Sequence, residues 1–599
     1  MIRIRSRPLA NQVTDDERRE RTGLDGRIAF AAAAFAFGAG LIVLLDRVGL
    51  PQNVSILGGF LLATGIACAI GMSVRSVRIS TFYAAGRSVP ATYGGLAGAA
   101  CLAGVAIIFL PPLPESLSMQ VIGLGLAGGL VGLTVLSAPV MRKSGAFSPS
   151  DLMAVRFPAR GFRLMSIMVI ASACGLTALA GFEQAIRLLT LELGIGRIFA
   201  SMIVGFILIF LIVPGGLAGF IWSAAGAGGM LLASLLLPLT VLALRGSELP
   251  LPFFGGAEIW AHASKRVGDW TQFAGAPEPS YWLALPIALG IAGFAPLLSL
   301  GIASRNRAGA QRTQIAMFAW LIAIVAMIVI IMAATALSLD VALLGQRPDR
   351  LADQIYRASS EGWLHVCGRV VDGPAPARAA CAAVPDFAAV LRPNDFSVSA
   401  AYLVFGLADL RELGGAYRGL TSASLFVACL ALASAGLQGV CTALGHDLFY
   451  RVRERFAITS RRLAITRLLL LLAVVGAGVG AAHGAFDPRM LIGLALAISA
   501  VGVLPLLLLA LWPRAGSLEA SLALIAGLGV ASGLLFKSSM LRVVLAEDLG
   551  QAAVIGSATA LCVGILVSLR RGATSEAGIV FVDTLMHGRD DSLNADRGA

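Results

Sequence analysis

Charged side chains are scarce in this chain. Asp, Glu, Lys and Arg make up 13% of its 599 residues, whereas hydrophobic residues make up 57%. A soluble domain carries about 25% charged residues, so most of this surface is not suited to water. The sequence also has no Walker, HExxH or GxSxG motif, which argues against an ATP-driven pump or a membrane hydrolase. We therefore expect a protein that is not an enzyme.

Metal and redox motifs are missing as well. The eight cysteines form no CxxC pair, and six of them lie in apolar runs, where Cys is usually a packing residue. Cys367 and Cys381 share one long polar loop, in which a disulfide and two unpaired thiols are both open. No cofactor is expected. The formal net charge of +12 comes mainly from Arg in short loops between apolar runs, so no nucleic-acid partner is expected either.

The sequence is instead rich in apolar runs that are long enough to cross a bilayer core of about 30 Å. We predict an all-α polytopic membrane protein with about 14 transmembrane spans. The spans are expected near residues 28–48, 54–73, 92–111, 120–141, 161–190, 197–213, 217–244, 282–302, 314–338, 417–445, 463–484, 489–512, 517–536 and 551–569.

The loops between these runs predict the orientation. If the N-terminal segment 1–27 is cytoplasmic, the cytoplasmic loops are the Arg-rich ones, as the positive-inside rule requires. An even number of spans then leaves the tail 570–599 in the cytoplasm too. We expect a multi-pass protein of the bacterial inner (plasma) membrane, whose partners are the lipid bilayer and a small-molecule solute. The oligomeric state is left open.

Two predicted spans, Ala91–Leu110 and Trp282–Ile302, are unusually rich in Gly and Pro, among them Gly94, Gly98 and Pro296. They lie five spans apart. Interrupted helices at matching places in two halves indicate an inverted repeat with a binding site near the midplane. The alternative is that each glycine only allows two helices to pack closely.

Ionisable residues inside a span are costly, so they indicate function unless they are paired. Glu183 and Arg187 are four residues apart, with Gln184 beside them, and can pair on one helix face. They could couple protons or bind a carboxylate, or Arg187 could reach the interface with Glu183 as its partner. For His446 and Asp447 we expect helix-end capping.

Neutral polar residues form a second group. Ser434, Gln438 and Thr442 are spaced by four and lie on one face of a predicted span. Neutral oxygens suit an ion or solute path because they replace hydration water without trapping the ion. Interhelical hydrogen bonds would explain the same residues equally well. Ser299, near Pro296, allows the same two interpretations.

Four short segments also match a family pattern in order and spacing. They are Phe82–Pro90 (FYAAGRSVP), Ser148–Phe157 (SPSDLMAVRF), Pro214–Ser223 (PGGLAGFIWS) and Ala435–Phe449 (AGLQGVCTALGHDLF). Together they resemble the sodium:solute symporter family, most closely its cation/acetate symporter branch, over roughly residues 54–540. The resemblance implies a LeuT-like fold of two inverted five-helix repeats, with extra helices at both ends.

This resemblance divides the chain into units. After the N-terminal segment 1–27, they are two extra helices at 28–73, the first repeat at 92–244, a periplasmic loop at 245–281, the second repeat at 282–512 with a periplasmic loop at 339–416, two C-terminal helices at 517–569 and the tail 570–599.

The implied activity is cation-coupled symport of a small organic solute, such as the monocarboxylate acetate, with Na⁺ or H⁺ as coupling ion. Some family residues are absent: the stretch Ala431–Ser434 leaves only Ser434 as a possible sodium ligand, Gly94–Phe109 has no polar residue beyond Cys101, and Ala224 stands where the family has Asp. The alternative is a divergent non-transporting member that acts as an accessory or sensory membrane protein.

Overall fold

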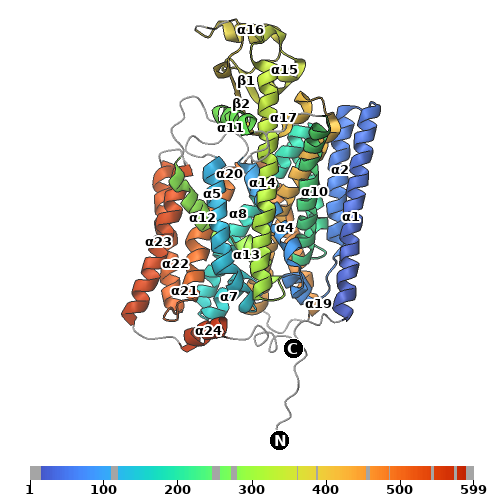
Figure 1. Ribbon diagram of the computed structural model, residues 1–599. Helices are drawn as coiled ribbons and strands as arrows, with labels where there is room; N and C mark the ends of the chain where they lie inside the picture. Colours follow the sequence, from blue (N-terminus) through green and yellow to red (C-terminus); the bar gives the residue numbers. More distant parts are fainter. Residues whose placement is uncertain are drawn as a thin grey trace.

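Membrane-length helices make up most of the computed structural model. It describes residues 15–109, 119–245, 257–271, 280–360, 362–385, 387, 389–453, 459–484, 486–540, 546–571 and 576–587. Most of the helices run roughly side by side, and a smaller lobe stands on one end of the bundle (Figure 1).

Twelve helical segments in this part of the chain are long and apolar enough to cross a membrane. Their helices are α1 (Asp15–Val48), α2 (Gln52–Ser73), α4 (Ala91–Ile108), α5 (Met119–Gly132) with η2 (Leu133–Ser137) and α6 (Ala138–Lys143), α8 (Arg160–Leu193), α10 (Leu217–Leu244), α14 (Arg307–Leu343), α18 (Gly415–Cys441) with η6 (Thr442–Arg453), α19 (Thr459–His483), α20 (Pro488–Ile498) with η7 (Ser499–Val503) and α21 (Leu504–Ala510), α22 (Ser517–Met540) and α23 (Ala546–Arg571).

A thirteenth span is bent. It consists of η3 (Tyr281–Leu283) and α12 (Ala284–Ala292), followed by α13 (Ala295–Ile302), with an angle of 44° at the break. The apolar helix α9 (Arg197–Ile212) has only 16 residues. The all-α membrane fold is therefore confirmed, whereas the predicted count of about 14 spans is reached only if α9 is also counted.

The remaining elements are short. They are α3 (Ile79–Ala84), η1 (Ala85–Arg87), α7 (Pro149–Arg156), α11 (Ala257–Thr271), η4 (Pro348–Arg350), α15 (Asp353–Ser360), β1 (Leu364–Val366), α16 (Pro374–Ala382), η5 (Pro393–Asp395), β2 (Phe396–Val398), α17 (Ala400–Leu410) and α24 (Glu576–His587).

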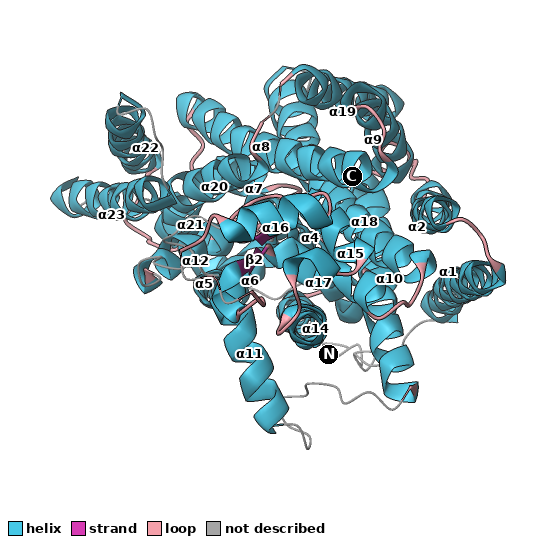
Figure 2. Ribbon diagram, turned by 90° about the horizontal axis from the view of Figure 1, so that it is seen from above, coloured by secondary structure: helices cyan, strands magenta, loops and turns pink. Residues whose placement is uncertain are grey.

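Helix α18 lies at the centre of the bundle, and its most apolar stretch is fully buried (Figure 2). It packs against α8 through two glycines. A Cβ atom on Gly181 would lie 2.6 Å from the backbone nitrogen of Ala433, and one on Gly436 would lie 2.5 Å from that of Ala178. Because helix association in lipid relies on close packing rather than on the hydrophobic effect, such backbone contacts hold the two helices together.

The two Gly-rich spans differ in structure, which corrects the prediction that both are interrupted. Helix α4 is continuous from Ala91 to Ile108. Its glycines allow close packing instead, since a Cβ atom on Gly95 would lie 2.6 Å from the backbone nitrogen of Met317 in α14. The second span does break, at Gly293, and Pro296 lies in the first turn of the helix that follows. Proline removes a backbone donor and favours the first turn of a helix, so Pro296 explains why the second span breaks and α4 does not.

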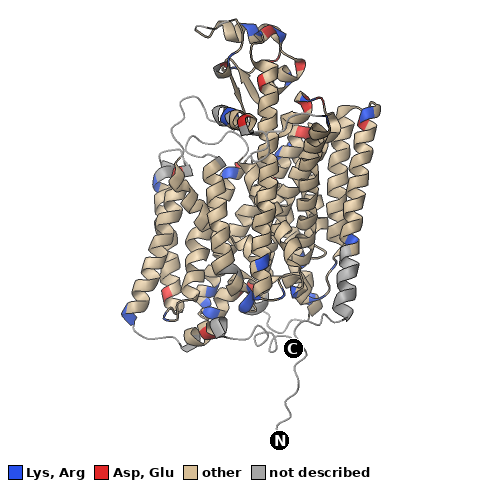
Figure 3. Ribbon diagram, viewed as in Figure 1, with Lys and Arg blue, Asp and Glu red and all other residues tan. Residues whose placement is uncertain are grey.

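The lobe between α14 and α18, residues 344–414, is called the cap below. It contains η4 to α17, including the antiparallel pair of β1 and β2, in which Leu364 faces Val398. Cys367 and Cys381 are joined by a disulfide within it. Charged residues gather in the cap and at the two ends of the bundle, whereas the middle of the bundle has almost none (Figure 3). This distribution is the one a bilayer requires.

Candidate functional site

A small cavity lies where the bent span meets the central helix. It has a volume of about 20 Å³, enough for about one water molecule. Its lining residues come from α8, α10, α13, α18 and η6, and from the short helices α3 and α7 and the residues just before α7. Helix α7 lies near the lower end of the bundle in Figure 1. It is called the inner cavity, and its lining residues are Tyr83, Phe147, Ser148, Pro149, Ile170, Cys174, Leu217, Ala295, Ser299, Gln438, Gly439 and Thr442.

Three residues singled out in the sequence come together here, although they lie on two separate helices. Ser299 on α13 donates a hydrogen bond to the carbonyl of Pro296 at 2.6 Å. Gln438 and Thr442 face the cavity from α18, and the Gln438 amide donates to the Thr442 hydroxyl at 3.3 Å. The lining therefore offers uncharged amide and hydroxyl groups to a bound ion or solute.

Two buried polar atoms near this face of α18 lack a partner among the described residues. They are the Gln438 Oε1 and the Ser434 hydroxyl, one turn apart. Cys101 of α4 packs against the same stretch, because its thiol donates to the carbonyl of Ala431 at 3.6 Å. Buried groups without a partner are rare, and those in native proteins often indicate a missing water, ion or ligand.

A polar network closes the cavity on the side opposite to the cap. Asp447 accepts hydrogen bonds from the hydroxyls of Ser148 and Ser150 and pairs with His446 Nδ1 at 2.6 Å. His446 and Asp447 are each only 1% exposed. They are thus buried where the polar network closes the cavity, whereas the sequence predicted only that they cap a helix end.

Tyr83 completes this closure. Its ring centroid lies 5.0 Å from that of His446, and its hydroxyl pairs with that of Thr466 at 2.5 Å. Burial raises the pKa of the Tyr83 phenol above its ordinary value, so the hydroxyl keeps its proton. The signal that could have found this network was present, since Tyr83, Ser148 and Asp447 lie in three of the four segments that carry the family resemblance.

Glu183 lies outside the inner cavity. Its fully buried carboxylate accepts from Arg197 Nη2 at 2.7 and 2.5 Å, while Arg187 stays 3.6 Å away, is 40% exposed, and donates to the carbonyl of Phe486. The same Arg197 also donates to two carbonyls at the end of α19. The sequence analysis missed Arg197 because it is the first residue of α9, and a positive charge at the end of a predicted span is common. Gln184, also buried, leaves its Oε1 without a partner among the described residues.

Gly94 and Gly98 face α14 rather than the cavity. A Cβ atom on Gly98 would lie 2.2 Å from the Met317 sulfur, and one on Gly94 would lie 2.9 Å from Thr313. Within the described part of the chain, no group of three or more His, Cys, Asp or Glu side chains could hold a metal ion.

Comparison with known proteins shows which class of fold the chain has. No family model matches the chain. A Na⁺-coupled sialic acid symporter of known structure has a TM-score of 0.61 and 14% sequence identity, over 88% of this chain and 99% of that one. A likeness at this identity shows the fold alone. The chain is a multi-pass membrane protein with the LeuT-like transporter fold.

One curated relative is similar in sequence. An uncharacterized symporter of Cupriavidus necator is 26% identical over 203 residues, which are 31% of this chain and 29% of that protein. The chain thus matches less than a third of the relative's length. A manganese transporter of Eremococcus coleocola has a TM-score of only 0.43 at 14% identity, over 86% of this chain and 99% of that one.

Proposed function

We propose that the chain is a secondary active transporter that couples uptake of a small organic solute to a cation gradient by alternating access. The observation that carries the proposal is the 44° break between α12 and α13 beside the polar face of α18. Broken helices in such transporters place unpaired backbone groups and helix ends at the binding site. The partial match to a symporter supports the same activity.

The chemistry of the inner cavity favours a short monocarboxylate such as acetate as the solute. The Gln438 amide can donate to carboxylate oxygens, and the hydroxyls of Ser299 and Thr442 can do so when they exchange their bonds to the carbonyls of Pro296 and Gln438. Ile170 and Ala295 offer an apolar wall to a methyl group. The cavity holds no charged lining residue, and its small volume suits a solute of a few heavy atoms after a modest opening.

Two coupling ions are compatible with this site. Sodium would be held by the Ser434 hydroxyl together with solute or backbone oxygens, although the continuous helix α4 offers no unwound carbonyl between Ala91 and Ile108. A proton would need a titratable group, and Asp447 is a buried acid that is hydrogen-bonded to the lining residue Ser148. In either case the ion must bind one conformation better than the other.

The experiment is uptake of radiolabelled acetate into proteoliposomes of the full chain, with sodium and proton gradients imposed separately. Accumulation driven by one gradient supports the proposal and identifies the ion. No uptake of acetate or of related monocarboxylates under either gradient, by protein shown to be folded, contradicts it. That result would favour a non-transporting accessory or sensory protein.

A further inference from the structure

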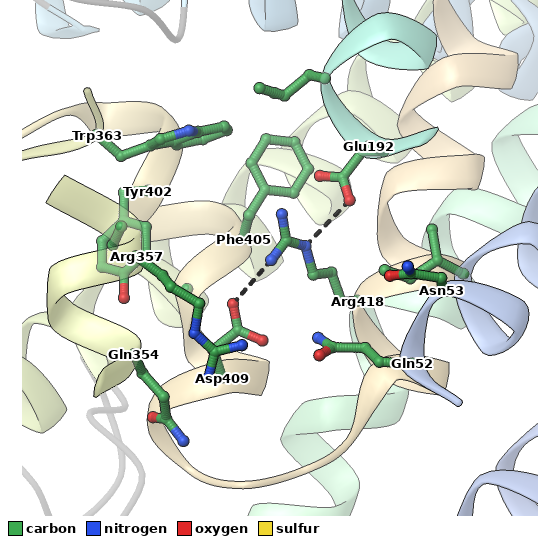
Figure 4. A pocket seen from close by; sticks show the side chains of 14 residues that line it. Gln52, Asn53, Glu192, Gln354, Arg357, Trp363, Tyr402, Phe405, Asp409 and Arg418 are labelled. Atoms are coloured by element: carbon green, nitrogen blue, oxygen red, sulfur yellow. Dashed lines mark hydrogen bonds and ion pairs between the residues drawn. The ribbon is translucent and has the colours of Figure 1, made fainter. Parts of the chain in front are cut away.

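A second and larger cavity lies between the cap and the bundle, at the end opposite to the closing network of the inner cavity. Its volume is about 250 Å³, and it has no lining residue in common with the inner cavity (Figure 4). It is called the cap pocket. Its lining residues are Gln52, Asn53, Ile56, Leu191, Glu192, Gln354, Arg357, Ala358, Trp363, Tyr402, Phe405, Gly406, Asp409 and Arg418.

Arg418, at the start of α18, joins two carboxylates in this pocket. It donates to Glu192 of α8 at 3.0 Å and to Asp409 of α17 at 3.1 Å (Figure 4). The positive charge of Arg418 is shared by the two carboxylates, while the charge of Arg357 and the amide of Gln52 also act on Asp409, so Glu192 is the less fully compensated carboxylate. The site therefore favours a positive group.

Arg357, on α15, supplies the opposite charge. It is exposed, and among the described residues its guanidinium acts on Asp409 through its charge, with no hydrogen bond between the two. Figure 4 shows it on the cap side of the pocket, beside Asp409. The pocket thus has the Glu192 carboxylate on its inner side and the exposed cation of Arg357 on its outer side, and Gln52, Asn53 and Gln354 add amide groups to the lining.

Glu192 has spare hydrogen-bonding capacity. Its side chain is fully buried, and its Oε1 has no partner among the described residues. The Ser422 hydroxyl lies close enough to act on this carboxylate, although within the described part of the chain it makes no hydrogen bond of normal geometry. Leaving a buried charged acceptor unpaired costs more than an ordinary lost hydrogen bond, so a donor from a ligand would stabilise this carboxylate.

The apolar wall of the pocket is aromatic. Trp363 packs edge-on against Phe405, with ring centroids 5.7 Å apart, and lies 6.4 Å from Tyr402. Aromatic faces attract ammonium groups and also accept aliphatic side chains. The volume of about 250 Å³ lies below the range of drug-sized sites, so the ligand should be small.

We propose that the cap pocket is a second solute site, separate from the inner cavity, for a small apolar α-amino acid in its zwitterionic form. The protonated amine donates to Glu192 Oε1 inside the pocket. The carboxylate pairs with Arg357 and the neighbouring amides, and the side chain lies against Trp363 and Phe405. The match is between two opposite charges in the ligand and two in the site, and it does not depend on the transport activity proposed above.

The test is binding of L-valine to the purified full-length protein by calorimetry, without any gradient. Isovalerate and isobutylamine are the matched halves of valine, because one lacks the amine and the other the carboxylate. We expect each half to bind at least about tenfold more weakly than valine, a difference of about 1.4 kcal/mol. Arg357→Gln and Glu192→Gln should weaken valine binding by at least about the same factor.

Arg369→Gln is the control, because Arg369 is an exposed arginine of the cap that does not line the pocket. It should leave valine binding unchanged. The proposal is wrong if valine does not bind, if its halves bind as well, or if Arg357→Gln has no more effect than Arg369→Gln. It is also wrong if Gln438→Leu, in the inner cavity, abolishes valine binding while Arg357→Gln leaves it intact. Since Arg357 is exposed, its variant stays informative even if Glu192→Gln fails to fold.

Discussion

The inner cavity and the cap pocket are built from different chemistry. The inner cavity is lined by apolar and aromatic residues together with a few amide and hydroxyl groups, and by no charged side chain. The cap pocket has two carboxylates, two guanidinium groups and three aromatic rings around a space more than ten times as large. Asp447 is hydrogen-bonded to Ser148 of the inner-cavity lining, whereas Arg418 itself lines the cap pocket.

The difference follows from the cost of placing charge. In the middle of a bilayer a charged group is expensive and binds its counterion too tightly for fast release, so a route through the membrane is better lined by neutral oxygens. Near water the same charges cost less free energy to place, and they make a site selective for ligands of complementary charge. The inner cavity is therefore suited to passage and the cap pocket to recognition. Four experiments test this distinction.

Arg418→Met should have the largest effect. It would leave the fully buried Glu192 carboxylate without its cation, and breaking a buried pair in this way costs about 3–5 kcal/mol. We expect a clearly lower unfolding midpoint in detergent at neutral pH. Arg489→Met is the control, because its pair with Asp487 is partly exposed and is worth at most about 1 kcal/mol. Equal effects of the two variants would contradict a buried charge centre in the cap pocket.

Gly293→Ala should abolish most transport without affecting the cap pocket. A Cβ atom at this position would lie 2.6 Å from the carbonyl oxygen of Ser499, so the break between α12 and α13 must shift. A displacement of about 1 Å at a reacting or binding centre can reduce a rate about 100-fold, and we expect a loss of that order in uptake. Gly229→Ala, where the new methyl group meets open space, should transport normally. Normal uptake by Gly293→Ala would show that the break does not form the route.

Gln438→Leu should reduce uptake by about tenfold or more, because a hydrogen bond to a charged solute is worth about 1.5–3 kcal/mol. Its control is the same substitution at Gln314, a buried glutamine of α14 that does not line the inner cavity. The Gln314 amide has no partner among the described residues, so Gln314→Leu should leave uptake unchanged and stability unchanged or higher. Similar losses in both variants would indicate a general packing defect.

Two aspartates of the cap should give the smallest effects, of opposite sign with pH. Burial raises the pKa of Asp409, so this residue stabilises the fold below its ordinary pKa and the stabilisation is lost as the pH rises through the raised value. The hydrogen bond from Arg378 lowers the pKa of Asp349, so its stabilisation is present above the ordinary pKa and is lost as the pH falls. The ordinary value is about 3.9.

The measurement is the unfolding midpoint of Asp409→Asn and Asp349→Asn relative to the wild type at a series of pH values. With rising pH, the wild type should lose its advantage over Asp409→Asn at values above the ordinary pKa. The stability advantage of the wild type over Asp349→Asn should instead grow as the pH rises toward the ordinary pKa from below. Parallel pH profiles for the two variants would contradict the assignment of Asp409 to a buried, charge-rich pocket.

Much of the fold could be predicted from the sequence because apolar length alone marks a span. The broken helix could be predicted only in part. Glycines in a span fit both a break and close packing, and the structure assigns packing to Gly95 and Gly98 but a break to Gly293. A proline just after the break separates the two cases, since α4 has none between Ala91 and Ile108.

The sites depend on contacts that no local pattern contains. Ser434, Gln438 and Thr442 share a face because they are spaced by four, so their grouping was accessible from the sequence. Their meeting with Ser299 was not, because it depends on how α13 packs against α18. The cap pocket joins residues from 52 to 418 and could not have been recognised without the structure.

The most direct test of the account is acetate uptake by the wild type, Gln438→Leu and Arg357→Gln measured side by side under the driving gradient. The account predicts that the wild type and Arg357→Gln accumulate acetate equally and that uptake by Gln438→Leu is lower by about tenfold or more, because the route passes the inner cavity and not the cap pocket. Full accumulation by Gln438→Leu, or its loss in Arg357→Gln alone, would contradict it.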